Sequence, residues 1–130
     1  MSPVEPQMLK GVLALLLLRL VSAQEDYGYS LVQRLRAAGL TDAAEGSVYP
    51  ALARLEARGL LVPRMVREGR GPGRRYYSPS AAGLTEATRL QQSWDVVGAV
   101  VLATGGGSAS TAVEDVHAGT GRASVVIEGG

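Results

Sequence analysis

The sequence predicts a mainly α-helical, α+β fold with a small β-wing and a long C-terminal helix. Three observations predict it. Three short helical patterns come first, separated by polar or glycine-containing connectors. Two strand-like segments then enclose residues 68–73, which contain three glycines and Pro72 and indicate a loop. A long apolar helical pattern follows over residues 81–103.

The first helix is predicted at about residues 7–21 and is apolar almost all round. Its leucines follow the i, i+3, i+4, i+7 spacing of a buried stripe, at Leu13, Leu16, Leu17 and Leu20. Residues 21–23 resemble a signal-peptidase site, but Arg19 interrupts the apolar run, which is also too short to span a membrane. We therefore expect a core helix covered on more than one side, and no membrane association.

The second helix is predicted to follow a polar connector at residues 22–26 and to begin near Tyr27-Gly28-Tyr29. Its inward side chains are expected to be Leu31, Val32 and Leu35. Gly39 is the expected C′ residue, since glycine accepts the left-handed conformation that ends many helices.

The third helix is predicted to begin at Ser47 as N-cap, with Pro50 in the first turn, where its missing N–H costs nothing. Its inward stripe is expected to be Val48, Leu52 and Leu55, and Gly59 ends it.

The wing is predicted as strands at about residues 61–67 and 74–78, with Pro79 ending the second strand and Ser80 capping the last helix. Tyr76 and Tyr77 alternate along the return strand, so one is expected to pack inward and the other to face out. In the last helix, apolar residues repeat with the spacing of a heptad seam, at Ala87, Leu90, Trp94, Val97 and Val101. Part of this seam can pack on the rest of the domain, and the remainder is most simply buried against a second copy of the same helix.

Composition points to an anionic partner and away from chemistry. The chain has 130 residues and a net charge of +1, but residues 54–75 hold seven arginines against Glu56 and Glu68, a local balance of +5. Such a concentrated basic segment suggests a localised anionic partner. No cysteine is present, and the one histidine, His117, has too few neighbouring ligands for a metal site. We expect no enzymatic activity, no cofactor and no metal.

The order of elements is that of a winged helix-turn-helix with an added C-terminal helix. We assign residues 1–79 to a DNA-binding domain, residues 80–104 to a dimerisation helix and residues 105–130 to a flexible Gly/Ser/Thr-rich tail. A short apolar run at residues 125–127 has no assigned role.

Several motifs also resemble those of the PadR-like transcriptional regulators, over roughly residues 7–100. In order along the chain they are Met8-Leu9-Lys10-Gly11, Tyr27-Gly28-Tyr29-Ser30-Leu31, Ser47-Val48-Tyr49-Pro50-Ala51-Leu52, Leu55-Glu56-Ala57-Arg58-Gly59-Leu60, Arg74-Arg75-Tyr76-Tyr77 and Gly83. Together they are specific, although each alone is weak. Residues 78–80 read Ser-Pro-Ser, where the family usually has Leu-Thr at the junction between wing and helix.

The DNA-facing candidates lie on the third helix and the wing. Arg54 is the candidate for the major groove, because a guanidinium can pair with guanine O6 and N7. The candidates for contacts with the DNA backbone are Ser47, Tyr49 and Pro50 at the start of the helix, and Arg70, Arg74 and Arg75 on the wing. The family resemblance supports Tyr49 and the wing arginines.

Other readings of these side chains remain open. Tyr49 is alternatively a packing residue between helices, since tyrosine is commonly half-buried. Arg58 and Arg64 are expected to be solvated or ion-paired rather than in contact with DNA.

Trp94 suggests a second hypothesis, a binding site for an effector at a dimer interface. In a two-fold dimer with an interface at Leu90, Trp94, Val97 and Val101, the two tryptophans could sandwich a planar hydrophobic effector. The resemblance implies such a pocket, since some multidrug-sensing members have a tryptophan at the corresponding place. Met8 and Leu15 on the first helix are the candidate lining residues. The alternative is that Trp94 only fills the dimer core.

We therefore expect a cytoplasmic, homodimeric repressor that binds double-stranded operator DNA. One alternative is a winged-helix module that binds another protein, since a fold does not fix a function. Another is nonspecific compaction of nucleic acid.

Overall fold

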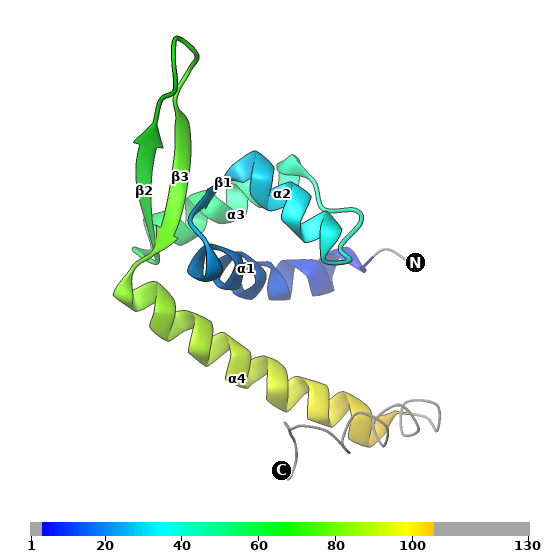
Figure 1. Cartoon of the computed structure of the whole chain (residues 1–130). Helices are drawn as coiled ribbons and strands as arrows, with labels where there is room; N and C mark the ends of the chain where they lie inside the picture. Colours follow the sequence, from blue (N-terminus) through cyan, green and yellow to red (C-terminus); the bar gives the residue numbers. More distant parts are fainter. Residues whose placement is uncertain (1–3, 106–130) are drawn as a thin grey trace. The chain divides into compact units, whose positions relative to one another are not determined.

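The structure is a computed structural model that describes residues 4–105. Its elements are α1 (Pro6–Ala23), β1 (Asp26–Tyr27), α2 (Gly28–Ala37), α3 (Glu45–Ala57), β2 (Leu61–Val66), β3 (Arg74–Pro79) and α4 (Ala81–Thr104) (Figure 1). This confirms the predicted winged-helix fold with a long last helix. Contacts divide the chain into two compact units that meet between Leu90 and Gln91, within α4. Of the expected tail only Gly105 is described, so His117 and the apolar run at residues 125–127 lie outside the described residues.

The sheet has three antiparallel strands in the order β1-β3-β2. β2 and β3 form the predicted wing, with Leu61 opposite Pro79 and Val66 opposite Arg74. β1 was not predicted; a polar connector and the start of a helix were expected at these residues. A two-residue strand is too short to show alternation, and it forms only because β3 pairs with it across the chain.

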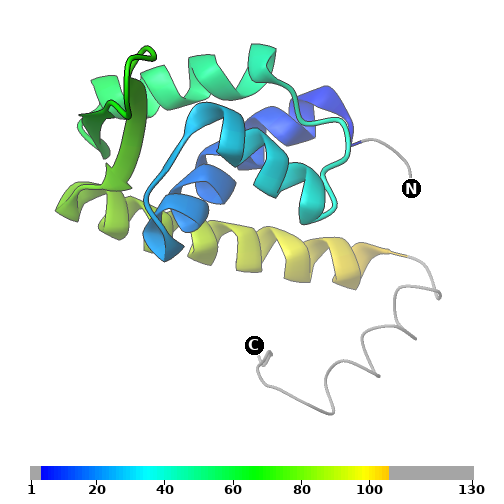
Figure 2. The ribbon, with the colours of Figure 1, turned by 45° about the horizontal axis from the view of Figure 1, so that its top comes forward.

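The core of the first unit lies between α1, α2, α3 and the inner face of the wing (Figure 2). The predicted inward residues of the second and third helices are buried, and so is Tyr77, whereas Tyr76 is partly exposed. α1 buries residues on several sides, at Leu13, Leu15, Leu17, Leu18 and Val21. By length and composition α1 could cross a membrane, but core helices pass the same test, and its leucines pack in the core here.

Two glycines end helices as predicted. Gly39 follows α2 with φ of 121°, and Gly59 follows α3 with φ of 74°. At each end the next backbone N–H reaches back into the last turn, Leu40 to Leu35 and Leu60 to Leu55. These are Schellman motifs, and their left-handed residue explains why glycine stands at both positions.

The start of α3 differs from the prediction. The helix begins at Glu45 with Ala44 as N-cap, so Ser47 is its third residue and not its cap. Pro50 consequently lies inside the helix, in its second turn, and not in the first turn. Without an N–H, Pro50 leaves the carbonyl of Gly46 without a helical donor, and this part of α3 is exposed to water that can replace it. Glu45 in the first turn complements the helix dipole in place of a capping side chain.

The first turn of α4 is fastened to the junction of α3 and β2. The Ser80 hydroxyl accepts a hydrogen bond from the Gly83 N–H at 3.0 Å, as predicted for a cap, and donates to the Gly59 carbonyl at 2.6 Å. A Cβ at Gly83 would lie 2.1 Å from the Leu60 carbonyl oxygen. Only glycine fits here, because the obstructing atom belongs to the backbone and cannot rotate away.

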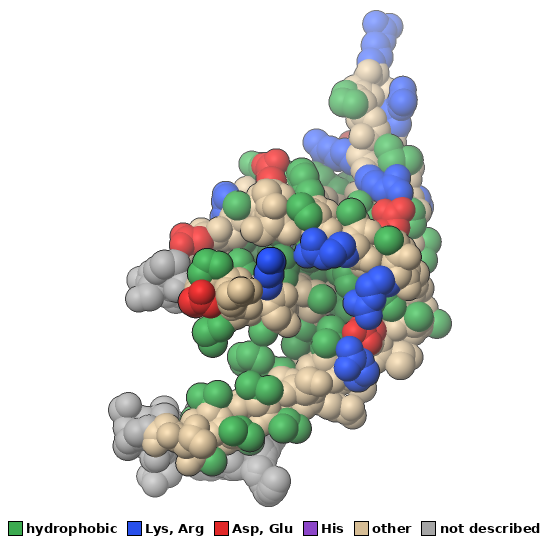
Figure 3. Space-filling model, turned by 180° about the vertical axis from the view of Figure 1, so that it is seen from behind, with side chains coloured by type: hydrophobic (Ala, Val, Ile, Leu, Met, Phe, Trp, Pro, Cys, Tyr) green, Lys and Arg blue, Asp and Glu red, His purple; other side chains and the backbone are tan. Residues whose placement is uncertain are grey.

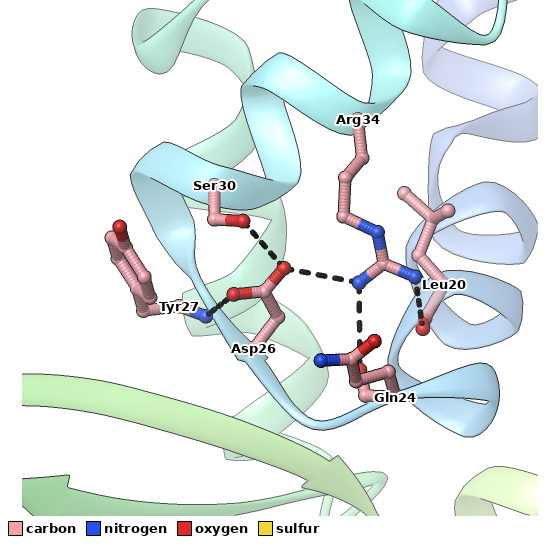
Figure 4. A network of polar contacts seen from close by, with 6 residues as sticks. All are labelled: Leu20, Gln24, Asp26, Tyr27, Ser30 and Arg34. Carbon is pink, nitrogen blue, oxygen red and sulfur yellow. Dashed lines mark hydrogen bonds and ion pairs between the residues drawn. The ribbon is translucent and has the colours of Figure 1, made fainter.

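A polar network ties β1 to α1 and α2 (Figure 4). The buried Asp26 carboxylate accepts hydrogen bonds from the Tyr27 N–H at 2.9 Å, the Ser30 hydroxyl at 2.6 Å and Arg34 at 3.1 Å. Arg34 also donates to the carbonyl of Leu20 at 3.0 Å, near the end of α1. The network satisfies a buried charge and fixes where β1 leaves the body of the domain.

Candidate nucleic-acid interface

One face of α3 is buried and the other is open to solvent. Val48 and Leu52 pack in the core, whereas Ser47, Pro50 and Arg54 are exposed. Among the described residues Arg54 has neither a hydrogen bond nor an ion pair with any side chain. The five donors of its guanidinium are therefore available to an external acceptor.

The wing carries basic side chains at its tip, as the space-filling view shows (Figure 3). Arg67 and Arg70 lie in the hairpin loop, are exposed and have no acidic partner within residues 4–105. Arg70 was predicted as a contact to DNA from the sequence, and Arg67 was not. Its place at the start of the same loop was the signal that could have identified it.

The arginines nearer the base of the wing are paired with carboxylates. Arg64 donates to both oxygens of Glu25, at 3.0 and 2.6 Å. The Arg75 Nε donates to Glu56 at 3.2 Å, and its Nη2 donates to the other carboxylate oxygen. Hydrogen bonding to Arg64 lowers the pKa of Glu25, and hydrogen bonding to Glu56 raises the pKa of Arg75. Arg75, a predicted contact to DNA, is thus already engaged with α3 in this structure.

Arg58 is paired as well, with Glu86 on α4 at 3.3 Å. Arg58 and Arg64 were expected to be solvated or ion-paired, and the structure shows that both are ion-paired.

Arg74 contacts an aromatic ring and forms no ion pair with the described part of the chain. Its guanidinium lies 4.6 Å from the centre of the Tyr27 ring, and Tyr27 in turn contacts Tyr76 with ring centres 5.1 Å apart. A cation–π contact uses the flat face of the guanidinium and leaves its edge donors available. Arg74 can therefore be oriented by Tyr27 while it keeps its capacity to bind phosphate.

Tyr49 is both packed and exposed. Its side chain keeps 43% of its surface open to solvent, and its ring lies against the backbone of Gly28 at the start of α2. Burial and the neighbouring carboxylate of Glu45 raise the pKa of the Tyr49 hydroxyl, which stays protonated at neutral pH. A protonated phenol at an exposed helix end can donate a hydrogen bond to an anion.

An open pocket of about 510 Å³ brings some of the predicted residues together. Tyr49, Arg74 and Arg75 line it, along with Tyr27, Tyr29 and Tyr77. Ser47, Pro50, Arg54 and Arg70 do not line it. The predicted set therefore spans a surface, with the pocket between α3 and the wing.

The residues predicted for dimerisation and effector binding fall on both units. Met8 is 65% exposed and Leu15 is buried, both on α1. Leu90 packs at the edge of the first unit's core, while Trp94, Val97 and Val101 belong to the second unit and are exposed. Within residues 4–105 no group of three His, Cys, Asp or Glu side chains could hold a metal ion.

Comparison with known proteins places this arrangement in a family. The model of the transcriptional regulator PadR-like family matches residues 17–89, more than half of the chain. No match was found among the curated proteins.

Solved structures agree with the family match. A PadR-like transcriptional regulator from Bacillus cereus strain ATCC 14579 shares 38% identity over 77% of this chain and 99% of its own, with a TM-score of 0.67. A Streptococcus transcriptional regulator shares 37% identity over 75% of this chain and 95% of its own, with a TM-score of 0.66. A PadR-like transcription factor from Bacteroides fragilis shares 32% identity over 74% of this chain and 92% of its own, with a TM-score of 0.65. The chain therefore belongs to the PadR-like family of transcriptional regulators, and its winged helix is that of a DNA-binding regulator.

Proposed function

We propose that the protein is a homodimeric, cytoplasmic repressor that binds a pseudo-palindromic operator. In each protomer α3 enters the major groove, where Arg54 reads base edges and Ser47, Tyr49 and Pro50 approach the backbone. The wing arginines Arg70, Arg74 and Arg75 contact the flanking backbone. The protein acts by binding, without a catalytic step or a cofactor.

The observation that carries this proposal is the guanidinium of Arg54 on the exposed face of α3, which forms no ion pair with any residue between 4 and 105. Other arginines nearby are engaged with carboxylates, Arg58 with Glu86 and Arg75 with Glu56. A guanidinium left without an internal partner, on the helix that a winged domain uses to read DNA, favours an external acceptor over a structural role.

Dimerisation is proposed through the second unit. Residues 91–104 expose a run of large apolar side chains, with Trp94 49% exposed and Val97 and Val101 more so. Apolar side chains at heptad spacing are covered efficiently by a second copy of the same helix. Leu90 would lie at the inner end of this interface. A two-fold dimer of this kind places half-sites about one helical turn apart.

An effector is proposed from the family resemblance and from the chemistry of Trp94. A planar hydrophobic molecule would stack on the indole ring. Such a molecule shifts operator binding only as far as it prefers one conformation of the dimer over another.

The test of DNA binding compares the duplex upstream of the protein's own coding sequence with a scrambled duplex, over a salt series. We expect specific binding about 10³-fold tighter than to the scramble, weakening steeply as salt rises. Arg54→Ala should reduce the specificity ratio about tenfold or more, since one bidentate base contact contributes about 1–3 kcal/mol. Arg58→Ala is the matched control: it removes an ion-paired arginine from the end of the same helix and should leave specificity unchanged.

The proposal is contradicted if the protein binds both duplexes equally weakly and also binds no fragment from the rest of the genome specifically. That result would favour a winged-helix module that binds protein. Tight binding without sequence preference would indicate compaction of nucleic acid. Sedimentation of the full chain and of Val97→Glu tests the dimer, which the substitution should dissociate.

A further inference from the structure

We propose that Gly28 is a positioning residue for Tyr49, whose ring occupies the space that any side chain at position 28 would need. Gly28 does not touch the ligand under this proposal. It sets the direction in which the Tyr49 hydroxyl points. The inference rests on the proposed function only in assuming that Tyr49 contacts DNA. The contact between the Tyr49 ring and Gly28 does not depend on that function.

The geometry is a direct steric exclusion. A Cβ added at Gly28 would lie 2.2 Å from Tyr49 Cε1, 2.9 Å from Cδ1 and 3.2 Å from Cζ. One edge of the ring therefore rests on the Cα of Gly28. The described glycines with positive φ are Gly39, Gly59 and Gly69, so the conformation of Gly28 is open to any residue. Position 28 requires glycine for space and not for backbone freedom.

The backbone at Gly28 cannot retreat from the ring. The two preceding residues, Asp26 and Tyr27, are paired with β3. Tyr27 is further held between Arg74 and the Tyr76 ring. The Asp26 carboxylate is fixed by the Tyr27 N–H and by side chains of α2 (Figure 4). The clash of a methyl group at position 28 must therefore be relieved by movement of the Tyr49 ring, which can rotate about its own side-chain bonds.

Displacing the ring has a consequence at its polar end. In the native position the Tyr49 hydroxyl lies near Glu45, Tyr27 and Tyr29, and the Tyr49 side chain lines the same pocket as Arg74. The hydroxyl and the Arg74 guanidinium are thus placed to bind the same phosphate-bearing surface. A rotated ring would carry the hydroxyl out of this arrangement while leaving the α3 backbone unchanged.

The first experiment is a double-mutant cycle on operator affinity, with the full chain as wild type, Gly28→Ala, Tyr49→Ala and the double variant. We expect each single substitution to weaken binding about tenfold, the size of one hydrogen bond to a charged group, and the double variant to be no weaker than either. Additive losses would overturn the proposal. Gly11→Ala is the control, because Gly11 is also helical and has no atom within 4 Å of an added Cβ.

The second experiment follows the ring without DNA. With tyrosine labelled at Cζ and the Tyr49 signal assigned through Tyr49→Phe, Gly28→Ala should shift that signal and lower the pKa of Tyr49 toward its ordinary value. Gly11→Ala should do neither. An unmoved Tyr49 signal in Gly28→Ala overturns the proposal. Thermal unfolding checks that the variant folds, which is expected because alanine is the better helix residue by about 1 kcal/mol.

The two readouts separate the proposals. If the Tyr49 signal moves in Gly28→Ala but the wild type shows no specific DNA binding, the positioning of the Tyr49 ring by Gly28 is supported and the proposed function fails. If DNA binding is specific but insensitive to both substitutions, the proposed function stands and the positioning role of Gly28 in it is overturned.

Discussion

The hairpin loop and the strands of the wing use the same residue type in opposite ways. On the strands, Arg64 and Arg75 are each held by both oxygens of a carboxylate, Glu25 and Glu56. In the loop, Arg67 and Arg70 are exposed and have no acidic partner in the described part of the chain. The two paired strand arginines fasten the wing to the body, whereas the two loop arginines are available to an external anion.

The difference shows how much of the charge of a basic segment is available to a ligand. Of the seven arginines between residues 54 and 75, three form ion pairs: Arg58, Arg64 and Arg75. Two of their partners, Glu25 and Glu86, lie outside that segment, so the local charge counted along the chain overstates the charge offered to a ligand. The four that form no ion pair within residues 4–105 are Arg54, Arg67, Arg70 and Arg74, on the two elements that a winged helix presents to DNA.

The largest effect is expected at the tip. Replacing Arg67 and Arg70 together by alanine should weaken operator binding about 100-fold at low salt and reduce the slope of log K against log salt by about two, one per lost phosphate contact. The free energy of unfolding should not change, because neither side chain has an internal partner. Binding over a salt series and chemical unfolding measure both quantities. An unchanged salt slope would show that the tip does not reach the DNA.

Arg75 tests the contrast between ion-paired arginines and arginines available to DNA, because it is both paired with Glu56 and a proposed contact to DNA. Arg75→Ala removes a proposed phosphate contact and leaves the Glu56 carboxylate unpaired beside the DNA-facing surface, and we expect about fivefold weaker binding. If Arg75 acts only by neutralising Glu56, adding Glu56→Gln should restore binding to near the wild-type value. If Arg75 itself contacts phosphate, the double variant should stay as weak as Arg75→Ala, and the contrast between paired strand arginines and free loop arginines would not hold for Arg75.

A smaller effect is expected at the other paired strand arginine. Arg64→Ala removes the ion pair with Glu25 and a cation–π contact 6.0 Å from the Tyr76 ring centre. Because the pair is exposed, the free energy of unfolding should change little. The salt slope of DNA binding should remain that of the wild type. A reduced slope would mean that Arg64 contacts phosphate despite its partner.

The smallest effect concerns Glu86, which is outside the wing but paired in the same manner with Arg58 and Arg89. Hydrogen bonding to Arg89, and then to Arg58, lowers the pKa of Glu86 from 4.5 to about 2. A lowered folded-state pKa stabilises the protein above pH 4.5, and that stability is lost as the pH falls toward 2. Glu86→Gln should therefore be less stable than the wild type at neutral pH, by under about 1 kcal/mol because both arginines are largely exposed. The difference should shrink between pH 4.5 and pH 2, as acid titrations of unfolding would measure.

Local sequence patterns predicted most of the elements. The leucine and valine spacings of the second and third helices, the glycines at 39 and 59, the wing strands and the Ser80 cap are confirmed. They could be predicted because periodicity and capping depend on residues within one or two turns of each other. In the first helix only Leu13 and Leu17 of the predicted stripe are buried, and Leu16 and Leu20 are partly buried. The same local reasoning misplaced the start of α3, where no side chain caps the helix and the preferred capping residue, Ser47, lies inside it.

By itself, then, the sequence determined the order of helices and strands, the family motifs and the presence of a basic segment on the third helix and wing. The tertiary structure decided which arginines are paired, that a third strand forms at Asp26–Tyr27, and that Gly28 supports the Tyr49 ring. Each of these depends on residues far apart in the chain, whose contact follows from how the wing and helices pack and leaves no periodic trace in the sequence.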